Sequence, residues 1–477
     1  MSAHSGHSPG LRDTAARPVE AALGASCSIS GAYRRQCGGS GHDFKWNMPD
    51  ERDSLDTMKP KILTTLQTYT KQLFMADLVA GISVAMVALP LSLAIAIASG
   101  ADPAKGLVTA IVAGFLISLF GGSRVQIGGP TGAFIVVVYQ VIADHGYDGL
   151  VIATFMAGLI LLVAGFLRAG RLIQLVPEPV INGFTIGIAI IIETSQLADL
   201  FGLSLVDVPA EFFGKLEALW SAKGGLSISA LVIGMLTMVL IVTMKRAMPR
   251  LPSLIIAVAI TSAMVAAFGL PVDTIQSRFG DLPRSLPVPS VPHLDAVRIV
   301  ELLPSAFIIA FLAGVESLLS AMVADRMIAS RHRSNAELIA QGAANLGSSL
   351  FGGLPATGAI ARTATNIRAG GKTPVAGLVH AVTILVVMLI AAPLAGYMAM
   401  PALAGLLILT AWNMSEPHRW PEYLQERRSD QFLLLLTLVL TVVADLAIAI
   451  GVGVVIGLAI RLRRRSIPPS SWKPPER

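Results

Sequence analysis

Apolar residues recur along most of this chain in long runs that short polar segments separate. Many of the runs reach the roughly 17–25 residues that an α-helix needs to cross a bilayer, a length that a soluble core does not require. The pattern predicts an all-α polytopic membrane protein with fourteen transmembrane segments. We expect them, in two sets of seven, at residues 78–98, 104–120, 131–144, 149–167, 173–197, 226–244 and 252–269, and at 300–323, 337–351, 357–368, 374–393, 400–412, 431–444 and 446–462.

Polar segments divide the chain around these two sets of spans. Residues 1–60 are rich in Gly, Ser and charge without periodicity, which is typical of a disordered tail, and they hold no apolar stretch resembling a signal peptide. Residues 61–76 carry apolar positions at helical spacing and predict an interfacial helix. The other divisions that we expect are a first repeat at 77–269, an extracytoplasmic linker at 270–299, a second repeat at 300–462 and a short basic tail at 463–477.

One motif occurs in both halves of the chain. Residues 118–133 read SLFGGSRVQIGGPTGA, and residues 349–359 read SLFGGLPATGA. Each copy places a proline, Pro130 or Pro355, just before Thr-Gly-Ala and a helical run, and proline can continue neither a helix nor a central strand. The chain therefore arrives extended and starts a helix inside the membrane. Interrupted segments at corresponding positions of two halves indicate the binding site of a transporter.

The segments 131–144 and 357–368, which follow the motif, are too short to cross about 30 Å of hydrocarbon at 1.5 Å per residue. We expect two half-helices that start at Thr131 and Thr357. An odd number of spans in each set inverts the second set relative to the first, so these starts meet near the midplane. Unpaired N–H groups and the helix dipole favour an anion there. Two ordinary threonine-capped helix starts are the alternative.

Basic residues are concentrated in alternate loops. With the N-terminus inside, the even-numbered spans end at clusters of Lys and Arg, whereas the segments 202–225 and 271–298 carry few for their length. This asymmetry follows the positive-inside rule and predicts that both termini are cytoplasmic. We expect a multi-pass protein of the cytoplasmic membrane. The net charge of +6 is assigned to this topology, because the chain has no basic–aromatic motif for a nucleic acid.

Glu316 lies deep in the predicted span 300–323, with no basic residue within one turn. A carboxyl group there needs a cation or a proton, because an intramembrane charge is costly. Ser320, four residues on, shares its helix face. We expect Glu316 and Ser320 to carry a coupling ion, H⁺ or less favourably Na⁺. A structural hydrogen bond to a neighbouring helix is the alternative.

Arg362 follows Thr357 by five residues, about 1.4 turns into the second half-helix. Arginine is always charged and binds oxyanions through two parallel N–H groups. Arg362 can therefore hold an anion, pair with Glu316, or do both. The anion site that we expect also uses the threonine hydroxyls, and Gly132 and Gly358 let a ligand approach the backbone.

Several function classes are disfavoured by what the chain contains. Its cysteines, Cys27 and Cys37, both lie in the N-terminal tail at a spacing that fits no zinc site. No nucleophile–base pair and no cluster of metal ligands is visible in the sequence. We therefore expect no enzyme activity, no metal and no cofactor.

The chain resembles a known family at several of these segments. The span with central Pro90 (GISVAMVALPLSLAIA), the QIGGPTGAF segment, VPEPVINGFTIGIAI and PATGAIARTATNIRAGGKTPVAGL look like the sulfate permease (SulP) family. The resemblance covers about residues 75–460, and the family includes animal solute-carrier anion exchangers and a cyanobacterial bicarbonate transporter. It implies two inverted repeats of seven spans, divided into a core domain and a gate domain, a homodimer, and an elevator-like movement of the core.

Carried to this chain, the resemblance implies an anion site at Thr131, Gly132, Ala356, Thr357 and Gly358. It matches Glu316 to an acid that is Asp in the bicarbonate transporter and Glu in proton-coupled relatives, and Arg362 to the basic residue near the anion. The chain departs from the family at its end, where the short segment after Ile460 leaves no room for the usual regulatory STAS domain.

These observations together predict a secondary active transporter of a small inorganic anion, with sulfate or bicarbonate as the first candidates and H⁺ symport as the expected coupling. Two alternatives stay open. A nucleobase or dicarboxylate carrier would use the same fold with other side chains. An uncoupled anion channel would conduct without a coupling ion.

Overall fold

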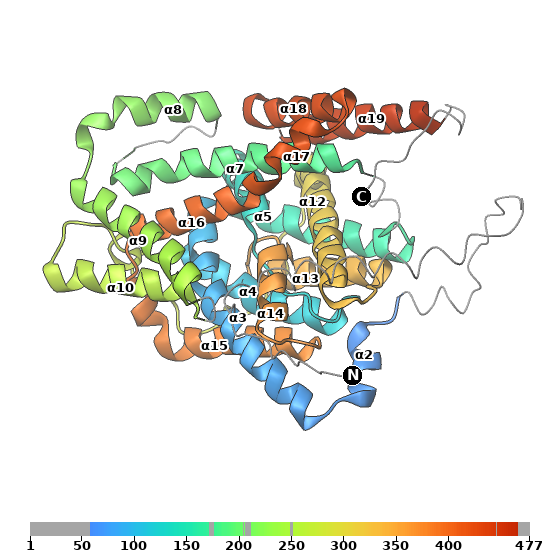
Figure 1. Ribbon diagram of the computed structural model, residues 1–477, viewed down its shortest axis with the longest axis horizontal. Coiled ribbons are helices and arrows are strands. Elements are labelled where there is room, and N and C mark those ends of the chain that lie inside the picture. The colour runs from blue at the N-terminus through green and yellow to red at the C-terminus, as the bar shows by residue number, and fades with distance from the viewer. Residues whose placement is uncertain are drawn as a thin grey trace, which may run out of the picture. The chain divides into compact units, whose positions relative to one another are not determined.

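The computed structural model describes residues 58–170, 176–203, 205, 211–248, 251–444 and 446–465, and this part of the chain is mostly helical (Figure 1). The expectations for the tails at 1–57 and 466–477 lie outside the described residues. The helices are α2 (Lys61–Thr65), α3 (Lys71–Ala98), α4 (Pro103–Phe120), α5 (Ile135–Phe166), α7 (Glu178–Phe201), α8 (Phe212–Ser221), α9 (Ile228–Ala247), α10 (Ser253–Phe268), α11 (Ile275–Phe279), α12 (Ala296–Ile328), α13 (Ser334–Leu350), α14 (Ile360–Arg368), α15 (Val375–Gly396), α16 (Met400–Met414), α17 (Trp420–Gln425), α18 (Arg428–Val443) and α19 (Leu446–Arg465). The strands are β1 (Gly128–Gly129) and β2 (Thr357–Gly358).

Helices that are long and apolar enough to cross a membrane confirm the predicted class. Within the described residues seven meet both conditions, namely α3, α4, α5 with the turn before it, α7, α9, α12 and α15. The shorter α10, α13, α14, α16 and α18 also lie at predicted spans. The chain is therefore an all-α polytopic membrane protein, and the exact number of crossings stays a prediction.

The region before the first long helix differs from the single interfacial helix predicted at 61–76. Helix α2 and a short 3₁₀ turn end at Thr68, and Tyr69 and Thr70 have extended backbones. The Thr70 hydroxyl accepts the Leu73 N–H at 3.3 Å, which is the arrangement of a helix N-cap. The last six residues of the predicted helix therefore belong to α3.

Asp77, near the start of α3, joins the two halves of the sequence. Its carboxylate is fully buried and accepts the N–H groups of Lys372 and Thr373, at 2.8 and 3.1 Å. The hydroxyl of Thr373 donates to it at 2.5 Å, and that of Tyr69 at 3.1 Å. Four donors offset the cost of burying the charge. Asp77 thereby fixes the loop that precedes α15 against α3.

A break divides α5 between the predicted spans 131–144 and 149–167. Gly146 has φ 71° and ψ 176°, a conformation that helical residues do not adopt and that glycine tolerates. The polypeptide turns there from the half-helix after the first motif into the next span.

Contacts between helices fall into two groups. In the first, α13 packs on α5 and α4, and α15 packs on α3 and α4. In the second, α7 packs on α18 and α16, and α9 packs on α10 and α16 (Figure 1). Glycines allow the close approaches, as in many membrane helix pairs. A Cβ at Gly158 of α5 would lie 2.8 Å from the Leu346 backbone nitrogen of α13.

The segment predicted as a linker at 270–299 contains one short helix, α11. It is anchored by a hydrogen bond from the Ile275 N–H to the Met398 carbonyl at 3.0 Å, and by another from the Met400 N–H to the Asp273 carbonyl at 2.8 Å. Helix α12 begins at Ala296, four residues before the predicted span, with Asp295 as its extended N-cap residue. The linker is therefore shorter than predicted.

Candidate functional site

The two copies of the sequence motif meet in the structure. Strands β1 and β2 pair antiparallel, with Gly128 opposite Gly358 and Gly129 opposite Thr357. The Ala359 N–H extends this ladder by donating to the Ile127 carbonyl at 2.8 Å. The antiparallel pairing is the arrangement expected for two inverted copies of one motif.

A helix begins immediately after each strand. Thr131 is the extended N-cap residue of the turn Gly132–Phe134 that leads into α5, as predicted. The second start was predicted at Thr357, and this is wrong, because α14 begins at Ile360 with Ala359 as its N-cap residue. Thr357 and Gly358 are held extended by the strand pairing, so helical geometry starts after them. The N–H groups at the two starts are unpaired within their helices.

A cavity of about 3330 Å³ is lined by both groups of helices. Its wall includes Thr131 and Gly132 from the first helix start, Ala359, Ile360 and Ala361 from the second, and the side chains of Glu316 and Arg362. The opposite wall comes from α7, α9 and α16. At 1.5 Å per residue, Arg326 lies about 15 Å along α12 from Glu316. Arg326 and Arg368 are exposed wall residues, so the cavity leads from a mouth that carries Lys and Arg beside carboxylates to the two helix starts.

Arg362 is a buried cation at the inner end of this cavity, with 1% of its surface exposed. One terminal nitrogen, Nη2, donates to the Pro130 carbonyl at 3.0 Å and to the Ser92 hydroxyl at 3.2 Å. The other two nitrogens, Nε and Nη1, have no hydrogen-bond partner. Unpaired donors on a buried charge are costly. Both nitrogens are themselves buried, so the arrangement holds a fixed and incompletely paired positive charge at the inner end of the cavity.

Gly129 in β1 makes room for this guanidinium group. A Cβ on Gly129 would lie 2.4 Å from Nη1 of Arg362, and its φ of +149° disfavours other residues. Two physical constraints therefore favour glycine at the position before Pro130, namely the space that the guanidinium group needs and the positive φ.

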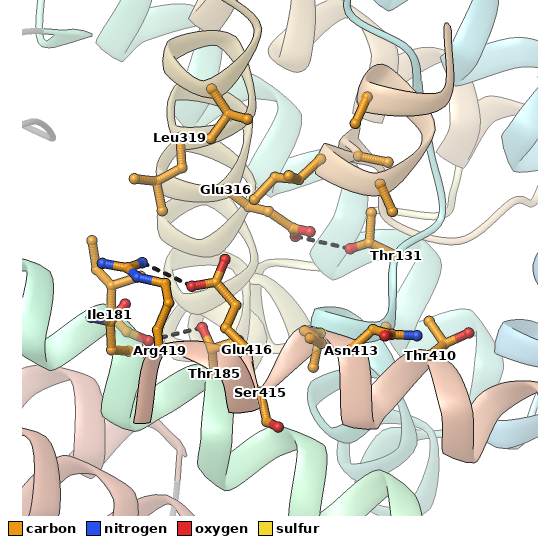
Figure 2. Close-up of a pocket in the computed structure, with 18 of the residues that line it drawn as sticks. Thr131, Ile181, Thr185, Glu316, Leu319, Thr410, Asn413, Ser415, Glu416 and Arg419 are labelled. Carbon is orange, nitrogen blue, oxygen red and sulfur yellow. Dashed lines mark hydrogen bonds and ion pairs between the residues drawn. The ribbon is translucent and has the colours of Figure 1, made fainter. Parts of the chain in front are cut away.

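Glu316 faces Thr131 across the inner end of the cavity. The Thr131 hydroxyl donates to Oε2 of Glu316 at 2.9 Å, and Figure 2 shows the two side chains turned toward one another. The described residues contain no ion pair between Glu316 and Arg362. Of the two predicted roles for Arg362, direct pairing with Glu316 is therefore absent from this structure.

Four other predicted site residues lie behind the cavity wall. Ser320 is fully buried, and its hydroxyl contacts that of Thr363 at 3.3 Å, so it does not share a ligand with Glu316 here. The Thr357 hydroxyl donates to the Ala313 carbonyl at 2.9 Å. Ala356 is bound through its N–H and carbonyl to the Asn345 amide, and Gly358 is packed against Gln126. None of these four is among the described residues that line the cavity.

The opposite wall carries its own ion cluster, near the mouth. Arg419 donates to Glu416 at 2.8 Å (Figure 2), and to Glu178, at the start of α7, at 3.1 Å. The two hydrogen bonds to carboxylates raise the pKa of Arg419, although burial acts against it. Deeper in the cavity, Gly132 lies close to Ile192 of α7 and Met414 of α16, which a Cβ would meet at 3.6 and 3.7 Å.

The sequence search missed a buried polar network directly behind the strands. Glu337 of α13 accepts the Gly122 N–H at 3.0 Å, the Ser317 hydroxyl at 2.9 Å and the Gln341 amide at 2.9 Å. Gln126 donates to the Ser317 hydroxyl at 2.8 Å. Glu337, Gln341 and Asn345 recur every four residues and so occupy one helix face. This polar stripe was the signal that could have revealed the network.

Comparison with known proteins shows to which family the chain with this site geometry belongs. Residues 74–437 match the family model described as the sulfate permease family. The chain belongs to the sulfate permease family. The predicted resemblance is therefore confirmed, and this is a family of transporters.

Two curated relatives illustrate the likeness. YvdB of Bacillus subtilis, named provisionally as a sulfate transporter, is 44% identical over 77% of this chain and 70% of its own length. The bicarbonate transporter BicA of a Picosynechococcus strain is 33% identical over 69% of this chain and 60% of its own length. The chain therefore spans 60% to 70% of the length of these relatives.

Solved structures show the same fold. The transmembrane domain of a cyanobacterial bicarbonate transporter, BicA, is 31% identical, with a TM-score of 0.72 over 82% of this chain and 98% of that one. Murine solute carrier 26 family member A9, an anion transporter in the inward-facing state, is 18% identical, with a TM-score of 0.77 over 97% and 78% of the two chains. The second likeness concerns the fold alone.

Proposed function

We propose that this protein is a secondary active transporter that carries a small inorganic oxyanion, sulfate or bicarbonate, across the cytoplasmic membrane. The observation that carries the proposal is Arg362, a fully buried cation with two unpaired N–H directions at the inner end of a cavity. The membership in the sulfate permease family and the names of the relatives support an anion as the cargo.

The anion would bind where the two helix starts converge. Arg362 supplies the charge, and the N–H groups around Gly132 and at residues 360 and 361 supply dipoles that point toward negative charge. In this proposal Thr131 and Gly132 contact the anion, as predicted. Ala356, Thr357 and Gly358 do not contact the anion in this proposal. They stabilise the strand pairing that positions Ala359 and Arg362 beside it.

Coupling to H⁺ is the finer part of the proposal, and it rests on Glu316. A carboxylate and an anion in one cavity repel each other, so a proton on Glu316 and an anion beside Arg362 stabilise each other's binding. Thr131 links the two, because it donates to Glu316 and begins the helix start that faces the anion. Such reciprocal binding is what symport requires. Na⁺ is the second candidate for the same carboxylate.

The movement would be an elevator step of a core domain, α3–α5 and α12–α15, against a gate domain, α7–α10 and α16–α19. The division of helix contacts into two groups supports this, and so does a cavity walled by both groups. The Lys and Arg residues at the mouth favour an inward-facing state by the positive-inside rule, which does not count carboxylates. Both termini would be cytoplasmic, and the working unit would be a homodimer.

Uptake into proteoliposomes tests the proposal. Sulfate, bicarbonate, chloride and fumarate are compared under imposed H⁺ and Na⁺ gradients. We expect saturable uptake of sulfate or bicarbonate that an inward H⁺ gradient stimulates and that collapses without it. Uptake driven by Na⁺ alone would refute H⁺ coupling. Uptake of fumarate alone would refute the oxyanion cargo, and single-channel currents without gradient coupling would indicate a channel.

A further inference from the structure

A basic cluster lies outside the cavity, where α2 meets two loops. The backbone N–H of Lys61 donates to the Gly121 carbonyl at 2.8 Å, and its Nζ donates to the Arg331 carbonyl at 3.0 Å. Arg333 donates through Nη1 to the Lys59 carbonyl at 2.9 Å, and through its backbone N–H to the Gly122 carbonyl at 3.0 Å. These bonds fix α2 against the loop after α4 and the loop between α12 and α13.

These bonds bring Lys61 and Arg333 to one place, with Arg331 in the same loop through its backbone carbonyl, and Arg124 is near enough to act on Lys61. We call Lys61, Arg124, Arg331 and Arg333 the basic cluster. Burial lowers the pKa of Lys61, and the nearby charges of Arg333 and Arg124 lower it further. Asp325 acts in the opposite direction, more weakly than either arginine. The folded chain therefore holds like charges close enough to repel one another.

No carboxylate among the described residues neutralises this cluster. Oδ2 of Asp325 accepts the backbone N–H of His332 at 2.8 Å and lies 2.7 Å from Nδ1 of the His332 ring, so this oxygen is already engaged. None of the four cations takes part in an ion pair within the described part of the chain. Arg124 and Arg331 are both exposed. An external anion would relieve the repulsion.

Exposed apolar side chains flank the cluster. Leu63 and Leu66, in α2 and the turn after it, are 57% and 48% exposed, whereas Ile62 is buried against the protein. Phe74 and Met75, in the first turns of α3, are 41% and 49% exposed. Because α3 is a membrane-spanning helix, these residues lie where the bilayer begins. A cationic site and an apolar strip at that level fit the two halves of a phospholipid.

We propose that the basic cluster binds the phosphate headgroup of an anionic phospholipid whose acyl chains lie beside Leu63 and Leu66. A free phosphate ion would use the cations but not the apolar side chains. The bilayer also supplies lipid at high local concentration, so even a modest affinity keeps the site filled. The bound lipid tethers α2 and both loops together, and one of those loops leads directly into β1.

Lipid binding to the full-length purified protein in detergent tests the proposal. Native mass spectrometry measures the affinity for dioleoyl phosphatidylglycerol and for dioleoyl phosphatidylcholine, which share their acyl chains. We expect a clear preference for phosphatidylglycerol. The double variant Arg124→Gln/Arg331→Gln removes two charges without removing any hydrogen bond that these side chains make in the described structure. It should bind phosphatidylglycerol tenfold or more weakly, since each basic residue near an anionic surface contributes on the order of a few-fold.

The matched control is Arg284→Gln/Arg298→Gln, which removes the same charge from two exposed arginines in the segment before and at the start of α12. It should keep the wild-type preference. Equal affinity for the two lipids, equal loss in the control, or full retention in Arg124→Gln/Arg331→Gln would overturn the proposal. Displacement of the lipid by inorganic phosphate at the same concentration would also overturn it, in favour of a free-anion site. If the preference for phosphatidylglycerol appears only after the acidic residues between 50 and 56 are replaced by their amides, the basic cluster binds this acidic segment and not a lipid.

Discussion

Arg362 is the residue around which the site is built. The cost of burying an arginine falls when its donors are paired, yet here Pro130 and Ser92 satisfy only Nη2. The carbonyl of Pro130 is itself free to accept because the motif interrupts the helix at that point. The unpaired Nε and Nη1 are themselves buried, with Nη1 against Gly129, so the guanidinium group would attract an oxyanion in the cavity by its incompletely compensated charge.

Substitution of Arg362 tests this interpretation. Arg362→Ala should weaken sulfate or bicarbonate binding about 10- to 100-fold, because a hydrogen bond to a charged group contributes about 1.5–3 kcal/mol. Arg362→Lys keeps the charge but not the planar guanidinium group, so its affinity for the anion should lie between those of the wild type and Arg362→Ala. Affinity is measured by calorimetry on purified protein. Arg326→Ala, at the exposed mouth, is the control and should have a much smaller effect. Wild-type affinity in Arg362→Ala would remove this residue from the site.

Glu316 gives a second prediction at the same scale. Glu316→Gln keeps an acceptor for the Thr131 hydroxyl but cannot take up and release a proton. We expect anion binding within a few-fold of wild type, and uptake that an H⁺ gradient no longer drives. Proteoliposome uptake with and without the gradient measures this. Glu193→Gln, on α7 and outside the described cavity wall, serves as the control. Gradient-driven uptake that survives in Glu316→Gln would exclude the proposed coupling.

Strands β1 and β2 show how far the sequence predicts an element of this site. The repeated motif predicted both chain breaks and their meeting, because proline and glycine restrict the backbone locally. It could not predict that Thr357 and Gly358 would pair with Gly129 and Gly128, since strand pairing depends on residues far away in sequence. Because of this pairing, the second helix starts at Ile360 and not at Thr357, where the sequence predicted it.

The polar stripe on α13 indicates that a network exists, but the partners of Glu337 could not be predicted from local pattern, for a related reason. Its partners Gly122, Ser317 and Gln341 lie on three separate segments, so no single stretch of sequence contains the set. The same holds for the hydrogen bond between Thr131 and Glu316. Sequence identified the polar residues inside the membrane, but only the fold assigns their partners. Ser320, placed beside Glu316 by helix periodicity, instead contacts Thr363.

Gly358 in β2 gives a prediction at the scale of elements. A Cβ at this position would lie 1.5 Å from Nε2 of Gln126 and 3.1 Å from the hydroxyl oxygen of Ser317. Gly358→Ala should therefore destabilise the protein by about 1–3 kcal/mol, the usual cost of overpacking, and should also weaken anion binding by displacing the strands. Thermal unfolding followed by intrinsic tryptophan fluorescence, with a parallel binding assay, measures both. Gly224→Ala is the control, because no atom lies within 4 Å of its added Cβ. Equally small changes in thermal stability and anion binding in the two variants would contradict the close packing of Gly358 against Gln126.

At the scale of the whole molecule, the two groups of helices contribute unequally to the cavity. The helix starts, Arg362 and Glu316 all belong to the group that contains α3–α5 and α12–α15. The other group supplies a wall of mixed character, with apolar side chains such as Ile186 and Leu409 beside polar ones such as Asn413, and with the Arg419 cluster near the mouth. An anion bound to the first group would therefore keep its ligands while that group moves along the wall. This separation is what an elevator movement requires.

Access to the cavity from one side of the membrane is the prediction that follows. In a background with Cys27 and Cys37 replaced by serine, Met322→Cys places a thiol on the cavity wall, and Val288→Cys places one in the linker, where the side chain is 85% exposed. If the mouth of the cavity is cytoplasmic, a membrane-impermeant maleimide should label Met322→Cys in inside-out vesicles and Val288→Cys in right-side-out vesicles. Sulfate or bicarbonate should slow the labelling of Met322→Cys alone, because a bound anion occupies the end of the same cavity. Labelling of both thiols from one side would contradict the orientation, and labelling of Met322→Cys from both sides in equal measure would indicate a continuous pore in place of alternating access.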